Sequence, residues 1–267
     1  MRVKSAPGAN TVLDDSGTAT PAANIELVDC IVRGEAVFLL AEDLQPLRLA
    51  WDNGLLATTE RLLSTSGGAR TPQPGELLQL DLRHVTALVR SGLCRMAGSQ
   101  GDPHQLPLQL ACTDSILVGG SGNALLEQIG AGDVEDFRQR ITWNGDRNCY
   151  DGFEVFWSIR GLDSEAPPEL MAFEAWRAHW GPEHENLPRL GRVNWRKLPA
   201  ADRAVHRFTP ADFALSEAAG NPAVGAASDG RNIGLEADRL PAPPLQLAPA
   251  GEASSATESS SSGPQPN

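Results

Sequence analysis

The chain has 267 residues and a mass of 28.4 kDa, enough for one large domain or two small ones with a buried core. Its 34 acidic and 22 basic side chains give a formal charge of −12, which disfavours binding to nucleic acid or to an anionic membrane surface. No apolar run approaches the roughly 18 residues that span a bilayer, and no apolar segment of a secretory signal follows the basic residues 1–4. Four dispersed cysteines without CxxC pairs argue against a disulfide framework.

The two ends of the chain differ in composition from its middle. Residues 1–22 are rich in Gly, Ala, Ser, Thr and Pro, and we expect them to form a flexible lead-in. Residues 246–267 are polar and of low complexity, so they cannot bury enough apolar surface to offset the entropy of the chain. We therefore expect one folded domain over residues 23–245, followed by a disordered tail.

Four segments in the first half share one pattern. In each, mostly apolar residues alternate with polar ones and lead to a polar residue, a small residue and two aliphatic residues, which is typical of a strand with one buried face. A second short apolar strand is expected after each segment, at residues 37–40, 62–63, 93–96 and 124–126. Without the Gly-rich insertions at 66–75 and 99–107, the repeat is roughly 22 to 25 residues long.

A repeat of this length with short strands and polar turns predicts a parallel β-solenoid. One turn cannot cover its apolar face alone, so equivalent residues of successive turns stack into ladders. We expect an aliphatic ladder of Ile25, Leu49, Leu82 and Leu110, and a polar turn ladder of Asp29, Asn53, Thr86 and Asp114. An antiparallel sandwich would explain the alternation but not the shared polar ending. The predicted fold is all-β, with four clear turns and a candidate fifth at residues 141–159.

Short motifs follow in a fixed order in the second half. They are Asn148-Cys149-Tyr150, Phe173-Glu174-Ala175-Trp176 with Trp180-Gly181 and Asn186, residues 209–215, Asn221-Pro222-Ala223 and residues 229–234. With these motifs the chain resembles bacterial right-handed parallel β-helix proteins of the pectate-lyase-like superfamily over roughly residues 24–240. The motifs are closest to those of uncharacterised β-helix proteins of planctomycete-type bacteria.

The resemblance implies a right-handed parallel β-helix (solenoid) with a short helix around residues 169–180 and an irregular C-terminal segment. It also implies an extracytoplasmic location, although this chain carries no signal peptide. Superfamily members have more turns than we count here, and the lead-in offers no amphipathic helix to cap the first turn. We therefore expect additional coils or domains of a longer protein as partners.

Superfamily members that cleave uronic-acid polymers use Ca²⁺-binding acidic clusters beside a basic residue, or paired aspartates for hydrolysis. The only adjacent pair of that kind, Asp14-Asp15, lies in the lead-in. Four further aspartates fall in turns or on solvated strand faces, at Asp29, Asp52, Asp81 and Asp114. We therefore recognise no catalytic set, and a Ca²⁺ site is unsupported.

Other candidate residues favour structural roles. His84 is predicted to be a packed core histidine. His179 and His184 lack the HExxH spacing, so no metal site is predicted there. The cysteines have no basic neighbour that would favour a thiolate, which indicates inert core thiols.

Aromatic residues concentrate between positions 143 and 195. They can pack a terminal helix over the last turn, or stack on the apolar faces of sugar rings, and we expect packing to dominate. If a glycan surface exists, we expect it at Trp143 and Tyr150, with Asp146, Arg147 and Asp151 as polar neighbours.

The predicted function is a non-catalytic module that binds carbohydrate or a cell-surface polymer within a larger extracytoplasmic protein. A polysaccharide lyase or hydrolase of the same superfamily is one alternative, and a structural spacer or interaction domain is the other. We expect no cofactor, no metal, no nucleic-acid partner and no membrane insertion.

Overall fold

The structure, a computed structural model, describes residues 22–162, 165–197 and 203–241, so nearly all of the predicted lead-in and all of the predicted tail lie outside it. Its longer strands are β1 (Ala23–Gly34), β3 (Leu47–Thr58), β5 (Leu78–Val89), β7 (Leu108–Thr113), β9 (Ala124–Gly130), β10 (Ile141–Asp146) and β12 (Val155–Gly161). The shorter strands are β2 (Leu39–Ala41), β4 (Leu63–Thr65), β6 (Cys94–Ala97), β8 (Ile116–Gly119), β11 (Cys149–Asp151), β13 (Glu169–Met171), β14 (Glu185–Asn186) and β15 (Arg189–Leu190).

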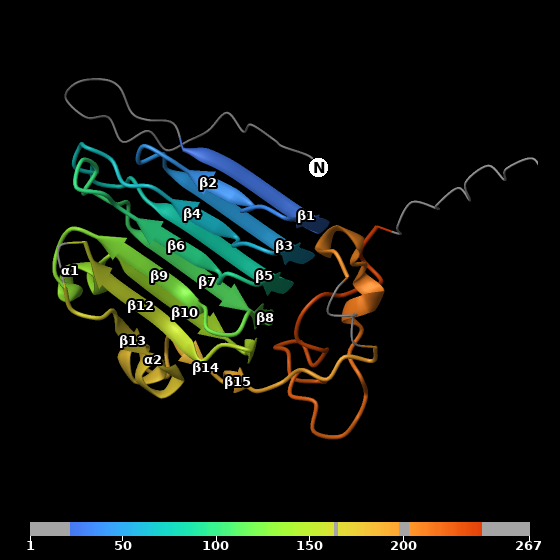
Figure 1. The fold of residues 1–267 in the computed structure, drawn as a ribbon. Coiled ribbons are helices and arrows are strands. Elements are labelled where there is room, and N and C mark those ends of the chain that lie inside the picture. Colours follow the sequence, from blue (N-terminus) through green and yellow to red (C-terminus); the bar gives the residue numbers. More distant parts are fainter. Residues whose placement is uncertain (1–21, 163–164, 198–202, 242–267) are drawn as a thin grey trace, which may run out of the picture.

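Two sheets stack turn upon turn along the molecule (Figure 1). In the first sheet β1, β3 and β5 lie side by side, after which β7, β10 and β14 continue one half and β8, β11 and β15 the other. The second sheet has the order β2-β4-β6-β9-β12-β13, and among its described pairs only β12–β13 is antiparallel. The chain is thus a parallel β-solenoid of about four turns, which excludes the antiparallel sandwich.

The apolar interior is built from ladders of equivalent residues, as stacking requires. Leu49 pairs with Ile25 on one side and with Leu80 on the other, and Leu80 pairs with Leu110. The predicted aliphatic ladder is therefore wrong at Leu82, which stands two residues further along, in the column of Trp51 and Cys112. The leucines at 78, 80 and 82 repeat at the period of the strand, so a slip of two residues keeps the same face buried and cannot be detected from the pattern.

One residue at each bend of the first sheet adopts a left-handed backbone with φ between 46° and 55°. We call these residues the turn ladder: Asp29, Asn53, His84, Asp114, Arg147 and Leu187. The prediction is confirmed at Asp29, Asn53 and Asp114, whereas His84 takes the place expected for Thr86 because of the same slip of two residues. Asn, Asp and His tolerate this conformation better than most residues, which accounts for the residue types on the first four rungs.

The described helices are α1 (Val134–Gln139), α2 (Phe173–Trp180) and the 3₁₀ helices η1 (Val205–Arg207) and η2 (Pro210–Phe213). The predicted helix around 169–180 begins only at Phe173, because Glu169–Met171 pairs with β12 as β13. α1 was not expected from the sequence; its N-cap is Asp133, whose side chain accepts a hydrogen bond from the backbone of Asp136. None of the described helices is long and apolar enough to cross a membrane.

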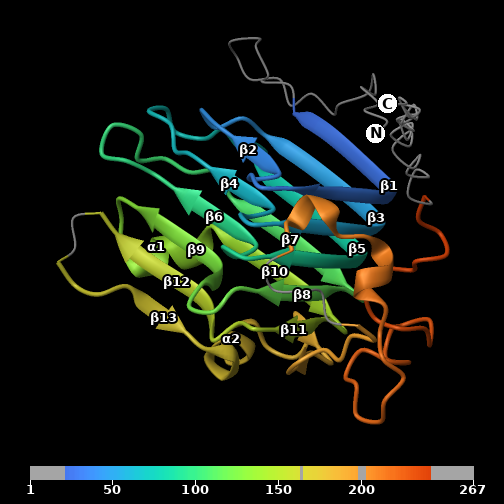
Figure 2. The same ribbon diagram turned by 45° about the vertical axis from the view of Figure 1, so that its right-hand side comes forward.

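Residues 203–241 form an irregular segment, here called the C-terminal strap, which packs beside the turn-ladder end of the first sheet (Figure 2). Its residues Val205, Phe208 and Phe213 form an apolar cluster with Leu55 and Ala57 of β3. A second cluster joins Ile116 and Cys149 to strap residues Ala223, Ala227 and Ile233. The strap therefore covers apolar side chains of the solenoid that would otherwise face water.

Candidate functional site

The residues predicted to form a glycan surface lie near one another, but the two aromatic residues are not at the surface. Trp143 and Tyr150 have no exposed area. Asp146 is half-buried, and its Oδ2 lies 2.7 Å from Nη1 of Arg147. Asp151 accepts a hydrogen bond from the backbone N–H of Val193 at 3.0 Å, and burial raises its pKa. Neither aromatic ring offers a face to a sugar, so the predicted surface lacks the two residues that would stack.

Both aromatic residues instead donate hydrogen bonds to a buried carboxylate, Glu185. The indole Nε1 of Trp143 and that of Trp176 lie 2.6 and 3.1 Å from its Oε2, and the Tyr150 hydroxyl lies 3.1 Å from each oxygen. Glu185 is 1% exposed, and burial raises its pKa although these hydrogen bonds oppose the shift. The cluster holds β14 and α2 against the last turn, in agreement with the expected packing role of the aromatic residues.

The outer side of the first sheet presents side chains in columns set by the strand register. One column is Asn24, Arg48, Gln79, Gln109 and Thr142, the next is Glu26, Ala50, Asp81, Ala111 and Asn144, and the third is Val28, Asp52, Arg83, Thr113 and Asp146. We call these three columns the polar face. Its side chains are exposed or half-buried, and most are amides, hydroxyls, carboxylates or guanidinium groups.

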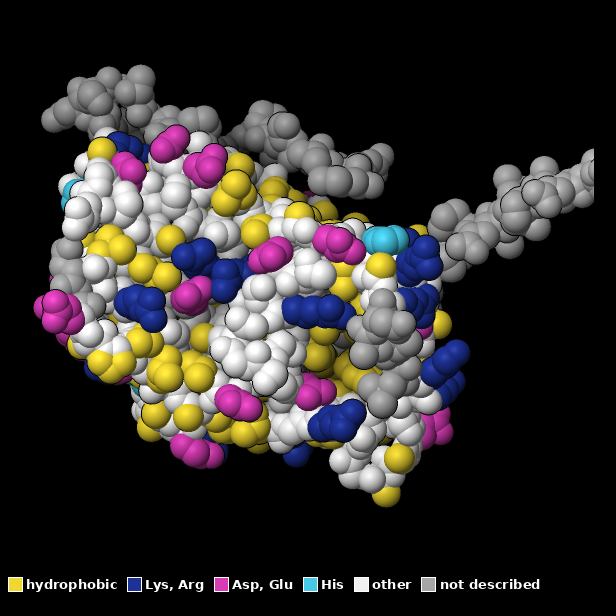
Figure 3. All heavy atoms as spheres, viewed as in Figure 1, with side chains coloured by type: hydrophobic (Ala, Val, Ile, Leu, Met, Phe, Trp, Pro, Cys, Tyr) yellow, Lys and Arg dark blue, Asp and Glu magenta, His cyan; other side chains and the backbone are white. Residues whose placement is uncertain are grey.

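Acidic and basic groups are mixed on this surface. Asp81 lies beside Arg48, with 4.0 Å between the carboxylate and guanidinium groups, and accepts a hydrogen bond from Gln79 at 3.0 Å. Asp52 is paired with Arg239 of the strap at 2.9 Å. Figure 3, which views the molecule from the side of the second sheet, shows that acidic and basic side chains are interspersed on that face as well. Asp52 and Asp81 thus fall in different outward columns, as the sequence indicated, whereas Asp29 and Asp114 are rungs of the turn ladder.

The strap crosses the turn ladder and bonds to it rung by rung. Ser228 donates backbone and hydroxyl hydrogen bonds to the Asp114 carboxylate. The backbone N–H of Glu236 donates to Oδ1 of Asn53 at 2.7 Å, and Nδ2 of Asn53 donates back to the carbonyl of Glu236 at 3.1 Å. Arg239 then reaches the first rung, with its Nε 3.0 Å from Asp29. The polar side chains of the turn ladder therefore anchor the C-terminal strap to the first sheet.

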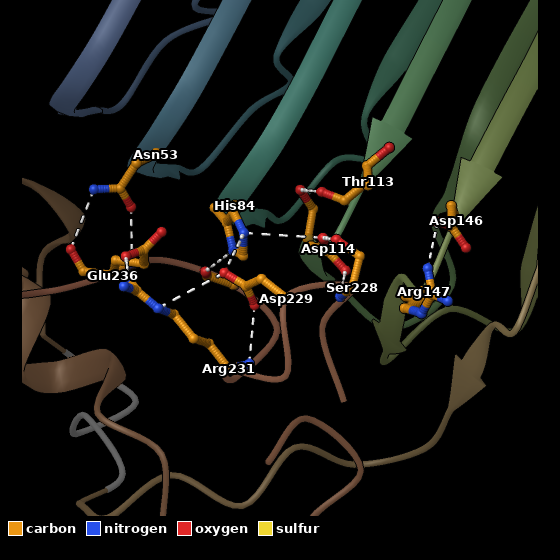
Figure 4. Close-up of polar contacts among 12 residues, drawn as sticks. Asn53, His84, Thr113, Asp114, Asp146, Arg147, Ser228, Asp229, Arg231 and Glu236 are labelled. Atoms are coloured by element: carbon orange, nitrogen blue, oxygen red, sulfur yellow. Dashed lines mark hydrogen bonds and ion pairs between the residues drawn. The ribbon is translucent and has the colours of Figure 1, made fainter. Parts of the chain in front are cut away.

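His84 is a central rung of the turn ladder (Figure 4). Its Nδ1 lies 3.2 Å from the carbonyl oxygen of Gly234, and its Nε2 lies 3.9 Å from Oδ2 of both Asp114 and Asp229. The ring is 2% exposed, and Nε2 has no hydrogen-bond partner. His84 is buried as predicted, but it faces acidic groups at the seam between solenoid and strap rather than the apolar core.

Two strap carboxylates complete this cluster. One atom each of His84, Asp229 and Glu236 lie within 4.8 Å of one another, the one such group of potential metal ligands in the part of the chain that the structure describes. Arg231 lies between the two acids, with its Nε 3.7 Å from Asp229 and an ion pair to Glu236. The backbone N–H of Arg231 is the main cause of a lowered pKa at Asp229. We call this group the seam cluster.

A surface cavity of about 390 Å³ opens beside the seam cluster. Arg231 and Glu236 line it together with apolar residues of the strap such as Phe213 and Leu235. Solvent ions therefore have access to one side of the cluster.

Three of the four cysteines are buried, and Cys30 is half-buried. Cys94, Cys112 and Cys149 are buried, and burial raises the thiol pKa of Cys112 and of Cys149 to about 12. This agrees with the expected inert core role, because the thiolate is the reactive form.

Compared with known proteins, the chain matches no protein-family model, and neither a curated protein nor a solved structure shows significant similarity to it. The parallel β-solenoid therefore stands on the strand register alone, and the resemblance to the pectate-lyase-like superfamily receives no support from these comparisons.

Proposed function

We propose that this chain is a non-catalytic β-solenoid module that binds an extended polar polymer along the polar face, with carbohydrate as the first candidate. The observation that carries the proposal is the strand register of the first sheet, which repeats polar side chains in columns. Neighbouring strands lie about 4.8 Å apart, so a column offers hydrogen-bonding groups at a regular spacing along the solenoid. A polymer with repeated hydroxyl groups can bond to several strands at once.

The mixed charge of the polar face favours a neutral polymer. Three of its four carboxylates, Asp52, Asp81 and Asp146, are each paired with an arginine, and Glu26 is the fourth. Hydrolysis or elimination needs an acid and a base in defined protonation states on either side of a bond. Carboxylates held in ion pairs with arginine do not form such an acid and base pair, which supports binding over cleavage. Recognition of a polymer at this face would then depend mainly on hydrogen bonds.

The test is binding to neutral polysaccharides by glycan array and affinity electrophoresis, with an ultraviolet assay for unsaturated uronate products run alongside. We expect binding without product, and a loss of about thirtyfold in affinity for the double variant Gln109→Ala/Asn144→Ala, since each of the two lost hydrogen bonds costs about 1 kcal/mol. The control is Ser64→Ala/Ser158→Ala on the half-buried outer positions of the second sheet. Equal binding by both double variants would contradict the proposed surface.

A further inference from the structure

The imidazole of His84 carries a buried nitrogen that lacks a partner. Its Nδ1 contacts the carbonyl oxygen of Gly234, which can only accept, so the proton of the neutral ring resides on Nδ1. Nε2 then presents a lone pair, and it faces the carboxylates of Asp114 and Asp229 at 3.9 Å. A lone pair that faces two carboxylates in a buried position is unfavourable, so Nε2 is a site for a cation, either a proton or a metal ion.

The surrounding residues hold this nitrogen in place. His84 sits on a rung of the turn ladder with φ 50°, between strands that are paired on both sides, and its ring is 2% exposed. Asp229 and Glu236 come from the irregular strap, where their side chains are 35% and 9% exposed. One histidine held by the solenoid thus lies within 4.8 Å of two carboxylates, Asp229 and Glu236, on the irregular strap.

We propose that His84 Nε2, Asp229 and Glu236 bind a divalent first-row transition metal ion, with Zn²⁺ as the first candidate, and that the ion fastens the strap to the solenoid. An imidazole with two carboxylates suits Zn²⁺, whereas Ca²⁺ takes oxygen ligands. Ligand atoms about 2.1 Å from a tetrahedral ion lie about 3.4 Å apart, so the strap acids must move inward. The Nδ1–H bond to Gly234 supplies the outer-shell contact that orients a ligating histidine.

Arg231 is the competitor of the metal ion. Its guanidinium group is paired with Asp229 and with one oxygen of Glu236, but it is 62% exposed, so it can turn to solvent at little cost. The other oxygen of Glu236 is paired with Arg239 at 3.2 Å, and that ion pair does not involve Arg231. Metal binding and the Arg231 ion pairs are therefore mutually exclusive. This proposal concerns the seam cluster and does not depend on polymer binding at the polar face.

The first test compares His84→Asn with the wild-type chain. Asparagine tolerates the left-handed backbone and offers an amide donor to the strap, as Asn53 on the neighbouring rung donates to the carbonyl of Glu236, but it lacks the Nε2 ligand. Isothermal titration with Zn²⁺ and visible absorption of bound Co²⁺ should give one ion per wild-type chain and binding weaker by at least about tenfold in the variant. His206→Asn, which removes an exposed histidine, is the control and should bind like the wild type.

The second test removes the competitor. Arg231→Ala should bind Zn²⁺ about two to five times more tightly than the wild-type chain, whereas Arg196→Ala, which removes another exposed guanidinium group, should not. Zn²⁺ should also raise the melting temperature of the wild-type chain but not that of His84→Asn. The proposal is overturned if the wild-type chain binds no Zn²⁺, if His84→Asn binds it equally, or if Arg231→Ala binds it no more tightly.

Discussion

Glu185 is a single carboxylate that three aromatic side chains share as a hydrogen-bond acceptor. Removing the acceptor would leave the donors of Trp143, Trp176 and Tyr150 buried without partners, at about 1–3 kcal/mol each. Keeping it costs something too, because the charge is buried and the pKa of the carboxyl is raised. At the junction of β14 and α2 the protein therefore keeps a carboxyl group whose charge is unfavourably buried but whose oxygens accept hydrogen bonds from three aromatic side chains.

This raised pKa predicts a pH-dependent stability. The folded chain holds the Glu185 proton more tightly than the unfolded chain, whose carboxyl titrates near 4.5. The contribution of this group to the free energy of unfolding is therefore largest at acid pH, and it falls as the pH rises from the ordinary pKa through the raised one. Glu185→Gln should remove this fall, as measured by urea unfolding between about pH 4 and 8.

The control for this measurement is Glu183→Gln, which neutralises an exposed carboxylate two residues away. It should leave the pH dependence unchanged. If Glu185→Gln and wild-type chains lose stability in parallel as the pH rises, Glu185 is not the group responsible.

Neither the Glu185 cluster nor the acidic surroundings of His84 could be predicted from the sequence. Glu185 lies in a stretch rejected as a metal motif, and its partners are up to 42 residues away. His84 was correctly expected to be buried, but its acidic neighbours on the strap lie about 150 residues further along, where no local pattern relates to them. Hydrophobic periodicity predicts which residues are buried, but it does not predict which polar side chains contact one another.

At the scale of the elements, the turn ladder sets where each turn bends. Its first rungs use residue types that adopt a left-handed backbone at low cost, whereas the last rung is Leu187, with φ 46°. Such a conformation costs an ordinary residue about 1–2 kcal/mol. Leu187 is also 54% exposed, so the burial of its side chain offsets little of this backbone strain.

We predict that Leu187→Asn stabilises the chain by about 0.5–1 kcal/mol, because asparagine relieves the backbone strain without the added chain entropy of glycine. The measurement is the midpoint of urea unfolding. The matched control is Leu190→Asn, a change of the same kind at a similarly exposed leucine within β15. A gain at Leu190 equal to that at Leu187 would show that reduced surface hydrophobicity, and not the backbone, is the cause.

Strand positions could be predicted because a strand with one buried face has a period of two and the turns repeat. Residues 141–159, the candidate fifth turn, form β10, β11 and most of β12, which continue the two sheets of a solenoid of about four turns. What failed was the register of β5, where three leucines at equal spacing allow two alignments. α1 was missed because six residues with a single buried side chain carry no helical period to detect.

At the scale of the whole molecule, the strap and the solenoid meet closely at Gly234. This glycine has φ 91°, and a Cβ atom there would lie 2.7 Å from both Ile116 and Thr86. Its backbone also donates to the carbonyl of Asp114 at 2.8 Å. A side chain at this position must push the strap away from the turn ladder.

Gly234→Ala should therefore detach the strap while the solenoid stays folded. We expect faster amide hydrogen exchange across residues 228–239, unchanged exchange in β3 and β5, and a melting temperature lower by several degrees, at about 2–4 °C per kcal/mol lost. Gly220→Ala is the control, because Gly220 has a similar φ of 85° but open space around its Cα. Strap exchange that is unaffected by Gly234→Ala would contradict this account of the seam.

The strap also bears on the order in which the molecule is made. During synthesis from the N-terminus, β1 and β3 leave the ribosome long before Glu236, which is 183 residues downstream of its partner Asn53. Neighbouring turns assemble by contacts between adjacent repeats, whereas the seam requires the closure of a very long loop, which is slow. The turns of the solenoid can therefore pair with one another before the strap reaches the turn ladder, which makes docking of the strap a late step of folding.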